Sequence, residues 1–361
     1  MTTTPRLDWR TLTMVLALVV IWVVFAVTTE GTFLSPRNLG LLARQMSIVA
    51  LLASGMVLVI VAGQIDLSVG AMSGLLGAIA AVAATRLGWP VPAAYALAPL
   101  LGMAFGALQG TLVARLRIPP FIVTLGGMLV FQGALLGLTR GITVTPPPAF
   151  LVIGQTYLPR SLAWGLQTMV VLALVRAAFA VNGAARMRRL LVAASLPLFT
   201  AVMDAHAGVP LPVLLLAVVA AALTVVATRT PFGRHLYAIG GNREAAFYAA
   251  IPIERRIVGV FALMGGLAGL AGLVLTARVG AATTDAGRML ELDAIAAAVI
   301  GGTSLLGGRG SVAGAILGAL VMASLDNGMS LLDTEAFWQP ILKGAILVAA
   351  VAADMAGRGR E

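Results

Sequence analysis

The sequence has no cysteine and very little charge. Without cysteine among its 361 residues, the chain has no disulfide framework and no thiolate metal site, and its redox compartment stays open. Only 11% of the residues are charged and 60% are hydrophobic, whereas an ordinary soluble domain carries about 25% charged residues. A water-soluble fold cannot hide so much apolar surface. Most of it must face lipid or other embedded helices.

Several catalytic signatures are absent as well. The chain has one lysine, Lys343, and no Gly-x-x-x-x-Gly-Lys-Ser/Thr phosphate loop, so it cannot bind ATP by that route. There is no His-Glu-x-x-His zinc pair and no Gly-x-Ser-x-Gly elbow, and the two histidines are His206 and His235. We therefore predict no catalytic residues, no metal ligands and no enzyme activity for this chain.

The net charge of +10 does not indicate a nucleic-acid-binding protein. The arginines are spread over many loops and form no basic domain with interleaved aromatic residues. Arginines near the ends of apolar segments instead set the orientation of membrane helices, because cytoplasmic loops retain them.

The apolar runs predict the fold class. They are long and do not alternate with polar residues, which favours helices over the short alternating strands of a membrane barrel. A bilayer core needs about 20 apolar residues per spanning helix. We expect spans at residues 11–29, 43–63, 69–85, 93–114, 120–138, 162–181, 190–204, 211–228, 257–277, 311–326 and 338–354, with a shorter apolar stretch at 292–306.

The distribution of arginine predicts the orientation. With the N-terminus inside, the cytoplasmic side receives the arginines of four segments: 115–117, 186–189, 229–256 and 358–360. The segment 140–160 and the acidic segment 326–335 then lie outside. We predict an all-α polytopic membrane protein with about 10–12 transmembrane or half-spanning helices and both termini cytoplasmic.

A first polar interruption lies between two apolar runs, at residues 63–70. It contains Gln64, Asp66 and Ser68. Charge close to a membrane span indicates function, but Asp66 or Ser68 could equally cap the helix that begins near Val69. The two interpretations are compatible.

A second interruption is the glycine-rich segment 301–311, which Glu291 and Asp293 precede. Glycine-interrupted, shortened apolar segments in comparable positions of two halves are typical of a transport pathway.

The basic segment 229–256 is too organised for a plain tether. Asn242 is suited to cap a short helix, and Glu244 would lie favourably in its first turn. Phe247 and Tyr248 would then project either into a groove of a partner or into the lipid interface.

Four segments together resemble the permease subunits of bacterial carbohydrate ABC importers, in the ribose, arabinose and xylose group. In chain order they are 63–70, 118–127, 237–246 and 291–304, within a resemblance that runs from about residue 39 to residue 354. Inside the group the chain is most similar to the xylose-transporting permeases. That similarity is carried by residues 325–330, 337–339 and 343–347 and by an additional helical pair near 162–208.

The resemblance implies one transmembrane permease domain over residues 1–361, with 229–256 as its cytoplasmic coupling loop. It implies a subunit of an ATP-driven monosaccharide importer, expected to carry xylose across the bacterial inner membrane. The expected partners are a second copy of the permease, two copies of an ABC ATPase and a periplasmic sugar-binding protein, but no nucleic acid. This chain would bind no cofactor, because ATP and magnesium belong to the ATPase.

Two sets of site residues follow. By position, the residues that couple to the ATPase would be Gly240, Gly241, Asn242, Glu244, Ala245, Ala246 and Phe247. Ala250 stands where this family often has glycine. For the translocation pathway, where sugar hydroxyls must exchange hydrogen bonds, we predict Gln64, Asp66, Ser68, Thr124, Thr303, Ser304 and Asn327.

A secondary sugar transporter driven by an ion gradient is the alternative function. It would need no partner ATPase and would depend on carboxylates inside the membrane. The Glu244-Ala245-Ala246 segment discriminates between the two, because only the ABC interpretation requires it.

Overall fold

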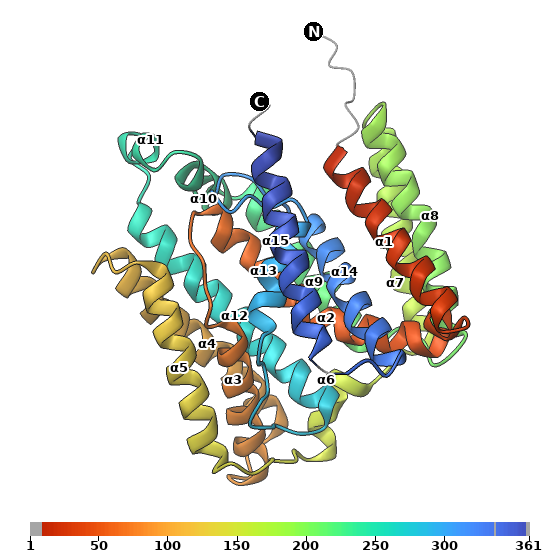
Figure 1. Cartoon of the computed structure of the whole chain (residues 1–361), viewed down its shortest axis with the longest axis horizontal. Helices are drawn as coiled ribbons and strands as arrows, with labels where there is room; N and C mark the ends of the chain where they lie inside the picture. Colours follow the sequence, from red (N-terminus) through yellow and green to blue (C-terminus); the bar gives the residue numbers. More distant parts are fainter. Residues whose placement is uncertain (1–8, 336, 359–361) are drawn as a thin grey trace.

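The structure is a computed structural model that describes residues 9–335 and 337–358, and over those residues it consists of helices and turns (Figure 1). The longer helices are α1 (Trp9–Thr28), α2 (Pro36–Val61), α3 (Val69–Thr85), α4 (Val91–Ala114), α5 (Pro120–Thr139), α7 (Arg160–Phe179), α8 (Ala184–Asp204), α9 (Leu211–Arg229), α12 (Ile253–Val279), α14 (Val312–Leu331) and α15 (Trp338–Arg358). The shorter ones are η1 (Thr32–Leu34), η2 (Pro148–Leu151), α6 (Val152–Gln155), α10 (Pro231–Gly241), α11 (Arg243–Tyr248) and α13 (Leu290–Ile300). The predicted all-α class is confirmed.

Each of the predicted spans coincides with a helix, and local signals explain the differences at the ends. The span expected from residue 190 begins earlier, at Ala184, directly after Gly183 with its positive φ of 65°. The span expected to start at residue 311 instead has Ser311 as its N-cap, whose side chain accepts a hydrogen bond from the Gly314 N–H. The stretch 292–306 is helical only as far as Ile300. Arg360 lies outside the described residues.

Seven of the described helices are long and apolar enough to cross a bilayer. They are α2, α4, α5, α7, α9, α12 and α14. Two shorter apolar helical stretches are Met14–Thr28 of α1 and the whole of α3. The chain is therefore a multi-pass membrane protein, and the predicted orientation of its termini stays a prediction.

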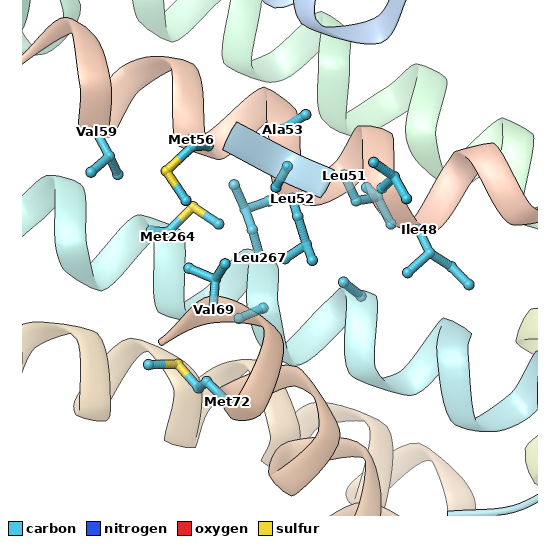
Figure 2. Packing of buried hydrophobic residues seen from close by; sticks show 14 of the residues in the cluster. Ile48, Leu51, Leu52, Ala53, Met56, Val59, Val69, Met72, Met264 and Leu267 are labelled. Atoms are coloured by element: carbon cyan, nitrogen blue, oxygen red, sulfur yellow. The ribbon is translucent and has the colours of Figure 1, made fainter. Parts of the chain in front are cut away.

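The helices form an inner and an outer group. Most of α2, α12 and α14 is buried by neighbouring helices, whereas α4, α5, α7 and α9 leave most of their surface uncovered. Figure 2 shows the inner packing, where side chains of α2 meet those of α3 and α12. Because Gly55 of α2 has no side chain, the Met264 and Leu267 side chains of α12 occupy the space beside it. The uncovered apolar faces of the outer group suit contact with lipid or with another subunit.

Glycines let α4 and α12 cross in backbone contact. A Cβ atom on Gly102 would lie 2.1 Å from the Gly265 carbonyl oxygen, and one on Gly106 would lie 2.0 Å from that of Phe261. Gly269 faces Ala98 in the same way. The glycine spacing in the sequence therefore serves close helix packing, as small residues do in membrane proteins.

Two helices, α3 and α13, begin inside the bundle. The connection from α2 to α3 runs from the end that carries α10 into the middle of the molecule, and residues 280–289 run from the opposite end to the start of α13 (Figure 1). Both α3 and α13 are thus half-helices that follow a non-helical segment. Such backbone at membrane depth is tolerated where protein buries it or where it lines a cavity.

Candidate functional site

The connection between α2 and α3 is built around one carboxylate. Asp66 is fully buried, and its Oδ1 accepts hydrogen bonds from the Ser68 N–H at 2.8 Å and from the Ser68 hydroxyl at 2.7 Å. Ser68 is the N-cap residue of α3, but its side chain makes no capping bond to the helix. In the described part of the chain Asp66 Oδ2 is buried without a hydrogen-bond partner. The expected side-chain cap of α3 is therefore wrong, because Asp66 Oδ1 holds the N-cap residue Ser68 itself and Asp66 Oδ2 remains available.

Other polar groups from α4 and α5 lie beside the connection between α2 and α3. Gln109 is buried, and its Nε2 donates to Ser68 Oγ at 3.0 Å. Thr124 of α5 donates to the Pro120 carbonyl at 2.9 Å and approaches the Ile65 carbonyl at 3.5 Å. The structure therefore groups three predicted pathway residues with Gln109. Sequence reasoning missed Gln109, although an amide beside the glycines of α4 was a visible signal.

Gln64 lies in the same connection and is also buried. Its Nε2 approaches the Ala62 carbonyl at 3.4 Å, and its Oε1 has no hydrogen-bond partner among the described residues. A second unused acceptor therefore accompanies that of Asp66. Unpaired buried polar atoms are costly, so each one needs an explanation.

The second interruption, residues 301–311, lies against the end of α2. The Gly308 N–H donates to the Val61 carbonyl at 2.9 Å, and the Ser304 N–H donates to the Arg309 carbonyl at 2.9 Å. Thr303 and Ser304 are both buried in this turn, and in the described residues Thr303 Oγ1 has no hydrogen-bond partner. Both predicted interruptions are therefore confirmed as non-helical turns, and the second packs on the helix that precedes the first.

The N-terminal ends of α3 and α13 meet inside the bundle. A Cβ atom on Gly70, in the first turn of α3, would lie 2.1 Å from Glu291 Oε2 and 2.5 Å from the Gly287 carbonyl oxygen. The buried Glu291 thus places its carboxylate beside the start of α3, where the partial positive charge of a helix N-terminus favours an anion. Half-helix N-termini that converge at mid-depth are the arrangement found around transport sites.

Asn327 lies apart from the other predicted pathway residues. Its amide pairs reciprocally with Asn38 of α2, at 2.7 Å and 3.0 Å. Asn38 is in the first turn of α2, about 35 Å of helix away from Val61 and the turn that rests on it. The structure therefore makes Asn327 a link between α14 and the start of α2.

Segment 229–256 contains two helices. The first, α10, was not predicted; Thr230 caps it by accepting from the Gly233 N–H, and Pro231 is its first residue. The second, α11, begins as predicted, with Asn242 Oδ1 accepting from the Ala245 N–H at 2.9 Å. It ends at Tyr248, before the left-handed Ala250 with a φ of 56°. Ala250 thus adopts the conformation that glycine favours.

The exposed side of α11 borders a cavity of about 800 Å³. Phe247 and Tyr248 are 67% and 78% exposed, whereas Ala246 is buried. Glu244 lies in the first turn of α11 and lines the cavity with Arg243, Phe247, Tyr248, Ile251 and Arg255, and across from them with Arg117 of the α4–α5 turn. An exposed aromatic pair beside such a cavity is suited to a protein partner.

A direct contact joins α10 to both interruptions. The Tyr237 hydroxyl donates to the Gly310 carbonyl at 2.8 Å, and burial raises the pKa of this phenol, so it remains a donor at neutral pH. A Cβ atom on Gly240 would lie 1.7 Å from the Val61 carbonyl oxygen and 2.8 Å from the Gly308 N. Gly241 lies against Gly308 as well. The predicted coupling residues Gly240 and Gly241 therefore contact the end of α2 and the 301–311 turn with their backbones, and Gly241 is also exposed at the surface.

The described residues contain no group of three His, Asp or Glu side chains that could hold a metal ion. That this chain binds no cofactor stays a prediction.

Comparison with known proteins adds a family and several relatives. The model of the family described as branched-chain amino acid transport system / permease component matches residues 38–351. The xylose transport system permease protein of Escherichia coli (strain K12) is 46% identical over 98% of this chain and 94% of its own length. The corresponding Haemophilus influenzae protein is 45% identical over 96% of both chains, and the D-allose transport system permease protein of E. coli is 33% identical over 93% of this chain and 89% of its own. No solved structure matches the chain.

Proposed function

The chain belongs to the branched-chain amino acid transport system / permease component family, and from this premise we propose that it is the membrane subunit of an ATP-driven importer of xylose. The near-complete coverage of xylose transport permeases at 46% identity supports the substrate. Identity to the D-allose permease and to a ribose import permease of Bacillus subtilis is lower, at 33% and 34%, which favours xylose over either of these sugars.

One observation supports coupling most directly, namely the contact of α10 with both polar turns. The Tyr237 hydroxyl donates a hydrogen bond to Gly310 in the 301–311 turn. The Gly240 backbone packs directly against Val61 at the end of α2. A displacement of α10 would therefore act on the 301–311 turn through Gly310 and on the end of α2 that leads into the first turn, because closely packed groups transmit strain. A partner that pushes or pulls segment 229–256 would move the residues that line the path.

The partner at α11 is an ABC ATPase, which binds ATP and magnesium on its own residues. Asn242 fixes the start of α11, and Ala246 anchors it to the membrane domain, while Glu244, Phe247 and Tyr248 face outward. Coupling to this ATPase requires segment 229–256 to lie on the cytoplasmic side of the bacterial inner membrane, and the many arginines of the segment support that location.

The sugar path runs past the two turns. Gln64 Oε1, Asp66 Oδ2 and Thr303 Oγ1 are buried acceptors without partners in the described part of the chain. A sugar hydroxyl that loses water on entering the membrane needs such acceptors, since an unmade hydrogen bond costs about 1–3 kcal/mol. The neighbouring predicted pathway residues are Ser68, Thr124 and Ser304. Asn327 instead links α14 to the start of α2 through Asn38.

A homodimer completes the pathway, and a periplasmic sugar-binding protein delivers the sugar. Most of the surface of the outer helices α4 and α5 is uncovered in a single chain. This surface can therefore contact a second copy of the permease as well as lipid. The whole chain then acts as one permease domain with 229–256 as its coupling segment.

Uptake of labelled xylose into proteoliposomes tests the proposal. The vesicles contain this chain, its ATPase and its binding protein, with Glu244→Ala and Glu244→Arg variants and the matched exposed controls Glu335→Ala and Glu335→Arg at the other end of the bundle. We expect uptake to need ATP and all three components, and to fall at least tenfold in Glu244→Arg only. Uptake by the chain alone on an ion gradient would establish a secondary transporter, and transport of another pentose would overturn only the substrate.

A further inference from the structure

One buried ionic cluster lies outside the path described above. The ammonium group of Lys343 in α15 lies 2.9 Å from Asp293 Oδ1 and Oδ2 in α13 and 2.9 Å from Asp326 Oδ2 in α14. The three side chains are only 17%, 6% and 13% exposed, and Lys343 is the one lysine of the sequence. Charges buried at membrane depth are expensive and indicate function by default.

Lys343 is on the packing face of α15. Leu347 and Val351, four and eight residues later, pack against the main hydrophobic core, and residues at this spacing share one face of a helix. Ile341 and Val348 on other faces are 52% and 69% exposed. Lys343 therefore does not extend along the lipid surface to reach water, as a lysine near a helix end commonly does.

The cluster joins three helices that are otherwise held in different ways. α13 and α14 touch through glycine, because Cβ atoms on Gly314 and Gly318 would lie 2.0 Å from the carbonyl oxygens of Gly301 and Ala297. No comparably close glycine contact is found between α13 and α15 in the described part of the chain. The Asp293 to Lys343 ion pair instead fastens α13 to α15.

Asp293 is also two residues from Glu291. The first turn of α13 thus carries two carboxylates, one against Gly70 at the start of α3 and one against Lys343. Because α13 is short, a shift at Asp293 moves Glu291 and the following 301–311 turn together. We propose that Lys343 and Asp293 form a positioning pair that holds half-helix α13 in the translocation pathway, with Asp326 as the second anion of the ammonium group.

This inference rests on the proposed function for its transport readout, and a second readout is independent of transport. Asp293→Leu and Asp326→Leu are matched variants, because each removes one of the two carboxylates that contact Lys343. The remaining carboxylate then forms an ion pair with the lysine that has no net charge. We expect Asp293→Leu to lower the maximal uptake rate at least tenfold with an unchanged KM, and Asp326→Leu to lower it less than threefold. Asp293→Glu should restore most of the rate.

The second readout is thiol labelling of α13 in detergent. The chain has no cysteine, so Ala298→Cys at a fully buried position introduces a unique thiol. We expect a maleimide to label it at least fivefold faster with Asp293→Leu than with Asp326→Leu. Equal labelling of the two variants overturns the proposal even if xylose is transported. Faster labelling with Asp293→Leu upholds the proposal even if xylose proves not to be the substrate, whereas faster labelling with Asp326→Leu overturns it. If Asp293→Leu does not insert, Lys343→Met and Lys343→Arg provide the same comparison, and equal labelling of that pair also overturns the proposal.

Discussion

At the scale of single residues, two roles of the Asp66 carboxylate can be separated by mutation. It accepts hydrogen bonds, and it can carry a negative charge. Its Oδ1 accepts from both the N–H and the hydroxyl of Ser68. Asp66→Ala leaves the Ser68 N–H unpaired in a buried place, whereas the Ser68 hydroxyl keeps Gln109 Oε1 as an acceptor at 3.2 Å. We expect a loss of about 2 kcal/mol in the free energy of unfolding. Asp66→Asn retains the acceptor and should lose less than about half of that. Unfolding in detergent measures both variants, and equal losses would contradict this account.

Most polar residues of the proposed path could be picked out in the sequence, but their hydrogen-bond partners could not. Gln64, Asp66 and Ser68 interrupt an apolar run, so their position alone identifies them. Gln109 and Lys343 lie inside helices, where apolar neighbours on both sides hide their role. Pairs such as Lys343 with Asp293, which are 50 residues apart, arise only from tertiary packing.

At the scale of elements, the crossing of α4 and α12 depends on glycine. A Cβ atom on Gly102 would overlap the Gly265 carbonyl oxygen, whereas one on Gly165 of α7 meets nothing within 4 Å. We expect Gly102→Ala to lower the free energy of unfolding by about 1–3 kcal/mol through overpacking. Gly165→Ala should raise it by about 0.5–1 kcal/mol, because alanine favours a helix. Thermal unfolding in detergent compares the two, and effects of the same sign would contradict the assigned contact.

Element identity followed from long apolar runs, whereas short elements depended on capping residues. Asn242 correctly indicated the start of α11. The Thr230-Pro231 pair is a comparable signal for α10, but an arginine-rich loop obscured it. The limits of α13 could not be predicted, since its non-helical flanks are stabilised by distant backbone groups such as the Val61 carbonyl.

At the scale of the whole molecule, the family and the class of function followed from four separated segments. Their relation in space did not. The contacts of segment 229–256 join residues that are far apart in the sequence. Tyr237 and Gly310, for example, are separated by 73 residues. The proposed coupling therefore depends on the assembled bundle, in which α10 lies at one end of the molecule (Figure 1).

The orientation of this bundle in the membrane is open to a direct test, because a chain without cysteine accepts single thiols as reporters. Tyr248→Cys and Leu332→Cys replace side chains that are 78% and 41% exposed, on α11 and just after α14, at opposite ends of the bundle. The arginines of segment 229–256 favour a cytoplasmic location for α11. We expect an impermeant maleimide to label Leu332→Cys in intact spheroplasts and Tyr248→Cys only in inverted vesicles. The reverse pattern would place α11 outside, beyond the reach of any ATPase, and would overturn the proposed coupling.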